Sequence, residues 1–244
     1  MSGHSKWSTI KHKKGAADAK RGQLFTKLSK AIIVAAKEGG ADPAANLSLQ
    51  NAIEKAKSYS MPKDTIERAI ARGAGTDSDA AAYETIVYEG YGPEGVAVLV
   101  EALTDNRNRT ASDVRHVFSK HGGNLGTTNS VSFMFKKMGV FRLNPEGIDQ
   151  DDLELYLIDH GLEEMGESTG EKGEPQIVIR CMFGDFGHLQ KALEDRKLTP
   201  LSAEHEYICL TPTELPEPQA TEVMELIDKL EQDDDVQKVY HTLA

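Results

Sequence analysis

The first thirty residues contain the side chains best suited to binding phosphate. They hold eight Lys or Arg residues and one acid, although the whole chain of 244 residues has a formal charge of −11. The basic residues are Lys6, Lys11, Lys13, Lys14, Lys20, Arg21, Lys27 and Lys30. Each Lys or Arg placed against a phosphate backbone releases condensed counterions, so this cluster favours binding to nucleic acid. Trp7 lies among them and could stack on a base, the alternative being that it packs against the chain's own domain.

The charge of the chain reverses sharply after this basic region. Residues 1–75 have a net charge of +8, whereas residues 76–244 have a net charge of −19. The acidic remainder repels the same polyanion, so contact should be confined to one end of the molecule. The alternative is a solvated basic tail that has no partner.

A second candidate for phosphate binding is the loop TDNRNRT, which contains Arg107 and Arg109. The loop follows an apolar strand and leads into a helix, and both arginine forks and helix N-termini suit anions. The alternative is that Asp105 or Asn108 caps the helix while the arginines face water.

Catalytic motifs are absent from the chain. It contains no GxxxxGK[ST] loop, no GxSxG sequence and no HExxH sequence. A hydrolase would have to use Asp105, His116 or His121, which lack the spacing of a nucleophile and base or of a metal site. The acidic run at 233–235 is predicted to be a solvated turn. We therefore expect no catalytic residue, no metal, no cofactor and no small-molecule substrate.

The sequence predicts a cytoplasmic protein. No apolar run is long enough to cross a membrane, and the basic N-terminus is not followed by the apolar stretch of a secretory signal. Cys181 and Cys209 lie in apolar surroundings without CxxC spacing, which indicates buried thiols in a reducing compartment.

The N-terminal third reads as a basic arm, 1–17, followed by a three-helix domain, 18–75. The first helix is expected at 18–38, with Lys27, Lys30 and Lys37 opposite its apolar stripe. Asp42-Pro43 is predicted to open a second helix that ends near Ser58. Pro62 opens a third helix that stops at Gly73, and it places Arg68 and Arg72 on one face.

The remainder alternates strands and helices. Strands are expected at 83–90, 95–104 and 130–136, with a helix at 110–121 that begins with a capping pair of Thr110 and Asp113. Residues 138–209 then read strand, helix, strand, strand, helix, strand, which is the order of a ferredoxin-like unit. A helix at 221–232 and a strand at 236–241 follow. The central strands of 138–209 offer one Phe and no aromatic string, so we do not expect an RNA-stacking platform there.

The predicted fold is therefore an α+β multidomain protein. Its three-helix domain is followed by two ferredoxin-like α/β domains, and the second is inserted in the first. The middle domain would comprise 83–137 plus 210–244, and the inserted domain would comprise 138–209.

Several of these segments resemble one family. They are GHSKW at 3–7, IKHKKGAADAKRGQLFTKL at 10–28, SMPKDTIERAI at 60–70, YEGYGPEGVAVLVEALTDNRNRT at 88–110 and KHGGNLG at 120–126. They closely resemble the YebC family, which includes the mitochondrial translational activator of cytochrome oxidase subunit I. The resemblance covers nearly the whole chain and implies three domains. Family members carry the label of DNA-binding transcriptional regulators, and the family has also been connected with stalled ribosomes. Asn129 stands where the family often has glycine.

The residues and the resemblance together favour a non-enzymatic, nucleic-acid-binding regulator of gene expression of the YebC type. The alternative is a ribosome-associated translation factor that binds ribosomal RNA and relieves stalled translation. A protein-only adaptor that acts through the acidic domains, and a hydrolase, are the remaining hypotheses.

Overall fold

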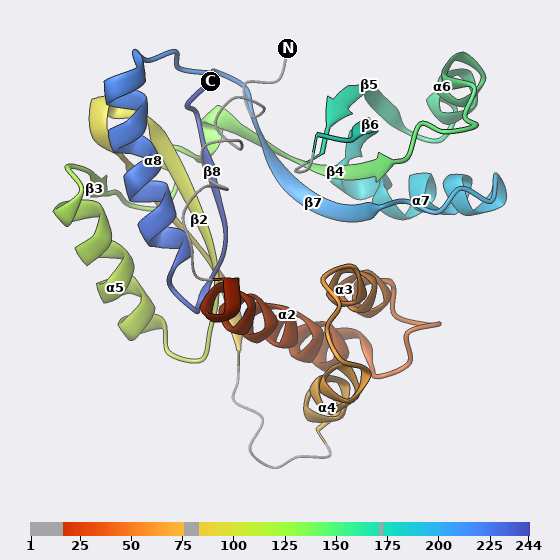
Figure 1. Ribbon diagram of the computed structural model, residues 1–244, viewed down its shortest axis with the longest axis horizontal. Helices are drawn as coiled ribbons and strands as arrows, with labels where there is room; N and C mark the ends of the chain where they lie inside the picture. Colours follow the sequence, from red (N-terminus) through yellow and green to blue (C-terminus); the bar gives the residue numbers. More distant parts are fainter. Residues whose placement is uncertain (1–16, 76–82, 171–172) are drawn as a thin grey trace. The chain divides into compact units, whose positions relative to one another are not determined.

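The computed structural model describes residues 17–75, 83–170 and 173–244 (Figure 1). These residues form two compact units. One unit comprises 136–208, and the other comprises the described residues up to 135 together with 209–244. Each unit contains one four-stranded antiparallel sheet. This confirms a mixed α and β fold with a helical N-terminal region.

The helical region consists of α2 (Ala17–Gly39), α3 (Leu47–Ser58) and α4 (Lys63–Gly73), as predicted in number and order. The helices α3 and α4 both pack against α2, and the aliphatic side chains of their shared core are at most 8% exposed. Among the core residues are Leu28, Ile32, Leu49, Ile53 and Ile66.

The second helix begins later than predicted. Its N-cap is Asn46, whose side chain accepts a hydrogen bond from the backbone N–H of Leu49. The side chain of Asp42 instead accepts from the N–H of Ala44 and forms a turn, because an aspartate side chain can bind the backbone two residues on. The prediction that Asp42-Pro43 opens the helix was therefore wrong.

The first sheet has the strand order β3-β1-β2-β8. Its strands are β1 (Glu84–Tyr91), β2 (Ala97–Thr104), β3 (Asn124–Leu125) and β8 (Val236–His241). A short 3-10 turn, η1 (Pro93–Gly95), joins β1 to β2. The helices α5 (Arg107–Lys120) and α8 (Glu217–Glu231) lie side by side next to this sheet (Figure 1). The strand β8 comes from the C-terminal end of the chain and pairs with β2.

The second sheet has the strand order β5-β6-β4-β7, which is the order of a ferredoxin-like unit. Its strands are β4 (Phe135–Leu143), β5 (Leu162–Thr169), β6 (Pro175–Met182) and β7 (Ser202–Cys209). The helices are α6 (Gln150–Ile158) and α7 (Phe186–Asp195), and the latter is preceded by the 3-10 turn η3 (Phe183–Asp185). Phe141 of β4 stacks on Phe186 of α7 with ring centroids 4.6 Å apart.

The sequence predicts one strand at 130–136 and a second strand that begins at 138. The structure has a single strand here, and the prediction of two was wrong. Residues Ser132–Met134 form a 3-10 turn, η2, and β4 then runs without a break from Phe135. The carboxylate of Glu89 accepts hydrogen bonds from the N–H groups of Asn129, Val131 and Ser132, which are therefore unavailable to a sheet. Asn129 has a φ of 67°, in the left-handed region where glycine is favoured.

Candidate nucleic-acid interface

Most of the predicted phosphate-binding arm lies outside the described residues. This holds for Lys6, Trp7, Lys11, Lys13 and Lys14. Lys20 and Arg21 lie in the first turns of α2, but their side chains are not described. The structure therefore locates four of the predicted side chains, which are those of Lys27, Lys30, Arg107 and Arg109.

Lys30 does not face water. Its side chain is 11% exposed, and its Nζ lies 2.5 Å from Oδ1 of Asp235 and 3.0 Å from the carbonyl oxygen of Asp234. The prediction that Lys30 projects away from the packed side of its helix was wrong, because the partner that buries it comes from a distant part of the chain.

Two further side chains of α2 contact the C-terminal end of α8. Nζ of Lys27 donates to the carbonyl oxygen of Glu231 at 2.8 Å, and Nε2 of Gln23 donates to that of Gln232 at 3.2 Å. Gln23, Lys27 and Lys30 lie three and four residues apart, so one face of α2 makes all of these contacts. The last carbonyls of a helix lack internal partners and carry partial negative charge, which makes a lysine a favourable neighbour.

Asp235 is the centre of this contact. In addition to Lys30, its carboxylate accepts hydrogen bonds from Arg109 at 2.7 Å, Thr110 at 2.8 Å and Thr104 at 3.1 Å. These five residues are called the Asp235 network below. The network joins α2, the end of β2, the first turn of α5 and the turn before β8, so segments far apart in the sequence meet at one carboxylate.

The ionisation of the network follows from these contacts. Burial alone would raise the pKa of Asp235, but the hydrogen bonds from Arg109, Lys30 and Thr110 outweigh it and hold that pKa well below its ordinary value. The hydrogen bonds that Arg109 donates to Asp235 and Asp105 raise the pKa of its guanidinium. Burial lowers the pKa of Lys27 despite the nearby acidic residues. Asp235 is thus a carboxylate held between two cations.

The acidic run at 233–235 was predicted to be a solvated turn, and this was wrong for its last residue. Asp235 is 4% exposed, whereas Asp234 is exposed and Asp233 is half-buried. Burial raises the pKa of Asp233. Nothing in the local sequence separates Asp235 from its neighbours, because its partners lie in other elements.

The loop before α5 is capped by a residue that sequence reasoning missed. The side chain of Asn106 accepts a hydrogen bond from the N–H of Arg109, and α5 begins at Arg107. The predicted capping residues Asp105, Asn108 and Thr110 are therefore not the N-cap. Asp105 instead accepts from Arg109 at 2.8 Å. The Arg109 side chain is 49% exposed although it binds two aspartates, and Arg107 is exposed at the helix N-terminus.

The helical region presents further cations to solvent. Among the described side chains of α2, α3 and α4, the exposed basic residues are Lys37, Lys57, Lys63, Arg68 and Arg72, called the exposed basic set below. Some already have partners in the chain. Lys63 lies 3.6 Å from Glu67, and Arg68 donates to the carbonyl oxygen of Asp64. These exposed contacts are weak, so the cations can still attract an anion.

The described residues contain no group of three or more His, Cys, Asp or Glu side chains arranged to hold a metal ion. Cys181 and Cys209 are both free thiols. Burial raises the pKa of Cys181 to about 11 and raises that of Cys209, so both are protonated near neutral pH. Across the described parts of the chain, no helix has the length and apolarity needed to cross a membrane.

Comparisons with known proteins agree with this architecture. The chain is 57% identical over 225 residues to a probable transcriptional regulatory protein of Myxococcus xanthus, covering 92% of this chain and 93% of the relative. A protein of the same description from Anaeromyxobacter dehalogenans is 59% identical over the same length, with the same coverage. The crystal structure of a conserved hypothetical protein from Aquifex aeolicus has a TM-score of 0.82 and 39% identity, covering 98% of this chain and 97% of that one.

The family comparison covers both parts of the chain. Residues 5–76 match the TACO1/YebC protein N-terminal domain, and residues 83–243 match the TACO1/YebC second and third domain. These matches confirm the resemblance that the sequence motifs indicate. The chain belongs to the TACO1/YebC family.

Proposed function

We propose that this protein is a non-enzymatic regulator of gene expression that binds nucleic acid through its basic N-terminal end. The observation that carries the proposal is the charge asymmetry between residues 1–75, at +8, and residues 76–244, at −19. The names of the relatives, which are probable transcriptional regulatory proteins, support a regulator of the YebC type, and DNA is the first target that we propose.

Two of the eight basic residues in the first thirty are not assigned to phosphate binding. Lys27 and Lys30 bind carbonyl and carboxylate groups of the chain itself, so we assign them to holding the helical region in place. Phosphate contact is then left to six residues, which are Lys6, Lys11, Lys13, Lys14, Lys20 and Arg21. The exposed basic set lies on the same region and extends the positive surface.

Arg107 and Arg109 form the second proposed contact. Both are exposed near the N-terminus of α5, and the helix dipole adds to the attraction for an anion. Arg109 is the less available of the two, because Asp235 and Asp105 already accept from it. A contact made mainly through phosphates is largely independent of base sequence.

The salt dependence of binding tests this assignment. If only these six N-terminal residues contact the phosphates of duplex DNA, log affinity falls with log salt with a slope of roughly −5, and if Arg107 and Arg109 also make contacts the slope is roughly −7. Changing Lys11, Lys13, Lys14 and Lys20 to Glu removes four contacts and should make the slope shallower by roughly 4 in either case. Fluorescence anisotropy with a labelled duplex and a labelled ribosomal RNA fragment measures both slopes.

A matched variant controls for the change in net charge. Lys120, Lys191, Lys197 and Lys229 are exposed residues of the acidic remainder, and changing all four to Glu alters the charge by the same amount. This variant should keep the wild-type slope. Equal loss of affinity in the two variants would show that only overall charge matters, and the N-terminal assignment would then be abandoned.

Recovery of crosslinked nucleic acid from cells separates the DNA target from the alternative ribosomal target. Promoter DNA that is enriched with the wild type and lost with the N-terminal variant supports a transcriptional regulator. Ribosomal RNA with the same behaviour supports a ribosome-associated translation factor. Recovery of neither would contradict nucleic-acid binding and favour an adaptor that acts through protein contacts.

A further inference from the structure

We propose that the outer face of α6 is a docking surface for a basic, partly apolar segment of a partner protein. This α6 face consists of two aliphatic side chains and three carboxylates: Leu155, Ile158, Asp151, Glu154 and Asp159. The face belongs to the unit formed by residues 136–208, so the proposal does not depend on phosphate binding by residues 1–75.

The helix α6 has apolar side chains on opposite sides. Leu153 and Leu157 are 2% and 0% exposed and pack into their unit. Leu155 and Ile158 are 69% and 56% exposed, and their spacing of three residues places them together on the outer side. A helix that packs against only one neighbour usually has a polar outer side, so this pair indicates a second partner.

The acidic residues of the face are not explained by helix stability alone. Asp151 lies in the first turn, where a negative charge favours the helix, but Asp159 is the C-cap, where a negative charge is unfavourable. The last turn contains no basic residue that would compensate. Asp152 is different, because it binds Arg196 at 2.6 Å, and the Arg196 guanidinium lies 4.1 Å from the centroid of the Tyr156 ring.

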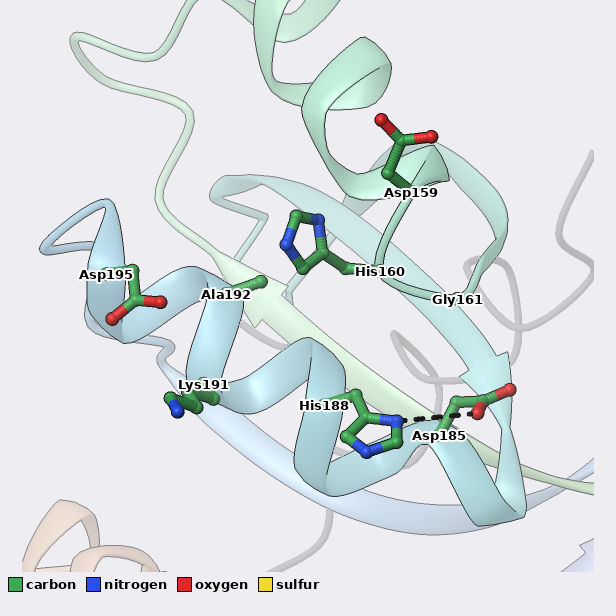
Figure 2. Close-up of a pocket in the computed structure, with 8 residues that line it drawn as sticks. All are labelled: Asp159, His160, Gly161, Asp185, His188, Lys191, Ala192 and Asp195. Carbon is green, nitrogen blue, oxygen red and sulfur yellow. Dashed lines mark ion pairs between the residues drawn. The ribbon is translucent and has the colours of Figure 1, made fainter.

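A pocket continues the acidic surface beyond the end of α6. Its volume is about 400 Å³, and it lies between the C-terminal end of α6 and α7 (Figure 2). Its charged and histidine side chains are Asp159, His160, Asp185, His188, Lys191 and Asp195. Three carboxylates and one lysine suit the insertion of a cationic side chain. The ring of His160 lies between the two helices, and His188 lies 3.8 Å from Asp185.

Charge complementarity identifies the occupant as basic. Residues 136–208 contain sixteen acidic and eight basic residues, so the unit repels nucleic acid and attracts cations. The exposed leucine and isoleucine supply the apolar contact area that a purely ionic interface lacks. The partner that fits is a protein segment with Lys or Arg beside aliphatic or aromatic side chains.

A designed peptide tests the proposal directly. The probe is a fluorescein-labelled peptide of about 16 residues in which Leu and Lys alternate at helical spacing to give one apolar and one basic face. Its affinity for the full chain is measured by fluorescence anisotropy. We expect binding that weakens at least about tenfold in the double variant Leu155→Ser/Ile158→Ser. A peptide with Glu in place of Lys should not bind.

A control variant shows whether the effect belongs to this face. Leu201 is 51% exposed in the same unit but is not part of the α6 face, so Leu201→Ser should leave the affinity unchanged. Equal affinity of wild type and double variant, or equal loss in the double variant and Leu201→Ser, would overturn the proposal. A wild-type dimer that the double variant abolishes would also overturn it and assign the face to a second copy.

The same variants separate this proposal from the proposed function. Leu155→Ser/Ile158→Ser should bind duplex DNA and ribosomal RNA with the wild-type salt slope. A changed slope would mean that nucleic acid covers α6, which would contradict a protein partner. Circular dichroism of each variant confirms that the comparison is made between folded chains.

Discussion

Acidic residues are used in opposite ways in the two units. In the Asp235 network, one carboxylate is buried and accepts hydrogen bonds from two cations and two hydroxyl groups. On the α6 face, carboxylates are exposed beside exposed aliphatic side chains. A buried charge must be satisfied inside the protein, whereas an exposed one can serve a partner. Formal charge in a sequence therefore does not reveal which role an acid has.

The largest expected effect is that of Asp235→Asn. The amide cannot balance the charges of Lys30 and Arg109, and Lys30 would remain buried without a carboxylate. We expect a loss of about 3–5 kcal/mol in the free energy of unfolding, measured by urea denaturation. The control is Asp234→Asn, because Asp234 is exposed and only its backbone carbonyl contacts Lys30. Similar losses in both variants would contradict a specific role for Asp235.

A smaller loss in the free energy of unfolding is expected for Lys30→Met. The methionine keeps the apolar volume of the stem, while Asp235 retains Arg109, Thr104 and Thr110 as donors. We expect a loss of about 2 kcal/mol, since one hydrogen bond between charged groups disappears. The control is Lys37→Met, an exposed change in the same helix, which should leave the free energy of unfolding almost unchanged. The double variant with Asp235→Asn should cost less than the sum of the two single changes, and strict additivity would show that the two residues are not coupled.

Glu89→Gln tests a buried carboxylate whose partners among the described residues are backbone N–H groups rather than cations. Burial would raise the pKa of Glu89, but the N–H groups of Val131, Asn129 and Ser132 lower it overall. A glutamine can offer only one oxygen to these donors, so we expect a loss of about 1–2 kcal/mol near pH 7.

The pH dependence of Glu89→Gln follows from that lowered pKa. Stability contributed by Glu89 is complete above its ordinary value of 4.5 and is lost as the pH falls through the lower pKa of the folded state. The difference in the free energy of unfolding between wild type and variant should therefore shrink as the pH falls. Urea denaturation of both chains at the same series of pH values, from pH 5 downward, measures this difference. A difference that grows with acidity would contradict the lowered pKa.

The smallest effect on stability is expected at the α6 face. Leu155→Ser and Ile158→Ser change exposed side chains, and each should alter the free energy of unfolding by less than about 0.5 kcal/mol. Leu157→Ala on the buried side of the same helix should cost about 2–5 kcal/mol because it leaves a cavity. Thermal denaturation of the three variants makes the comparison, and a large loss at Leu155 would mean that this side chain stabilises its own unit.

Much of the fold follows from local patterns in the sequence. The three N-terminal helices, the order of elements in 138–209 and the strand at 236–241 were all predicted, because hydrophobic periodicity and Gly or Pro boundaries act over a few residues. The caps were predicted less well. Asn46 and Asn106 cap α3 and α5, although nearby Asp, Asn and Thr residues have similar propensities. Small differences in backbone geometry decide between such neighbours.

The charge asymmetry, the absence of catalytic motifs and the family are properties that the sequence alone determined. Only the tertiary structure decided that Lys30 is buried against Asp235, which lies 205 residues away, and that Glu89 binds the backbone before β4. It also decided that Leu155 and Ile158 are exposed while Leu153 and Leu157 are not. The physical reason is that burial and ion pairing depend on distances in space between segments, whereas propensity and periodicity act along the chain.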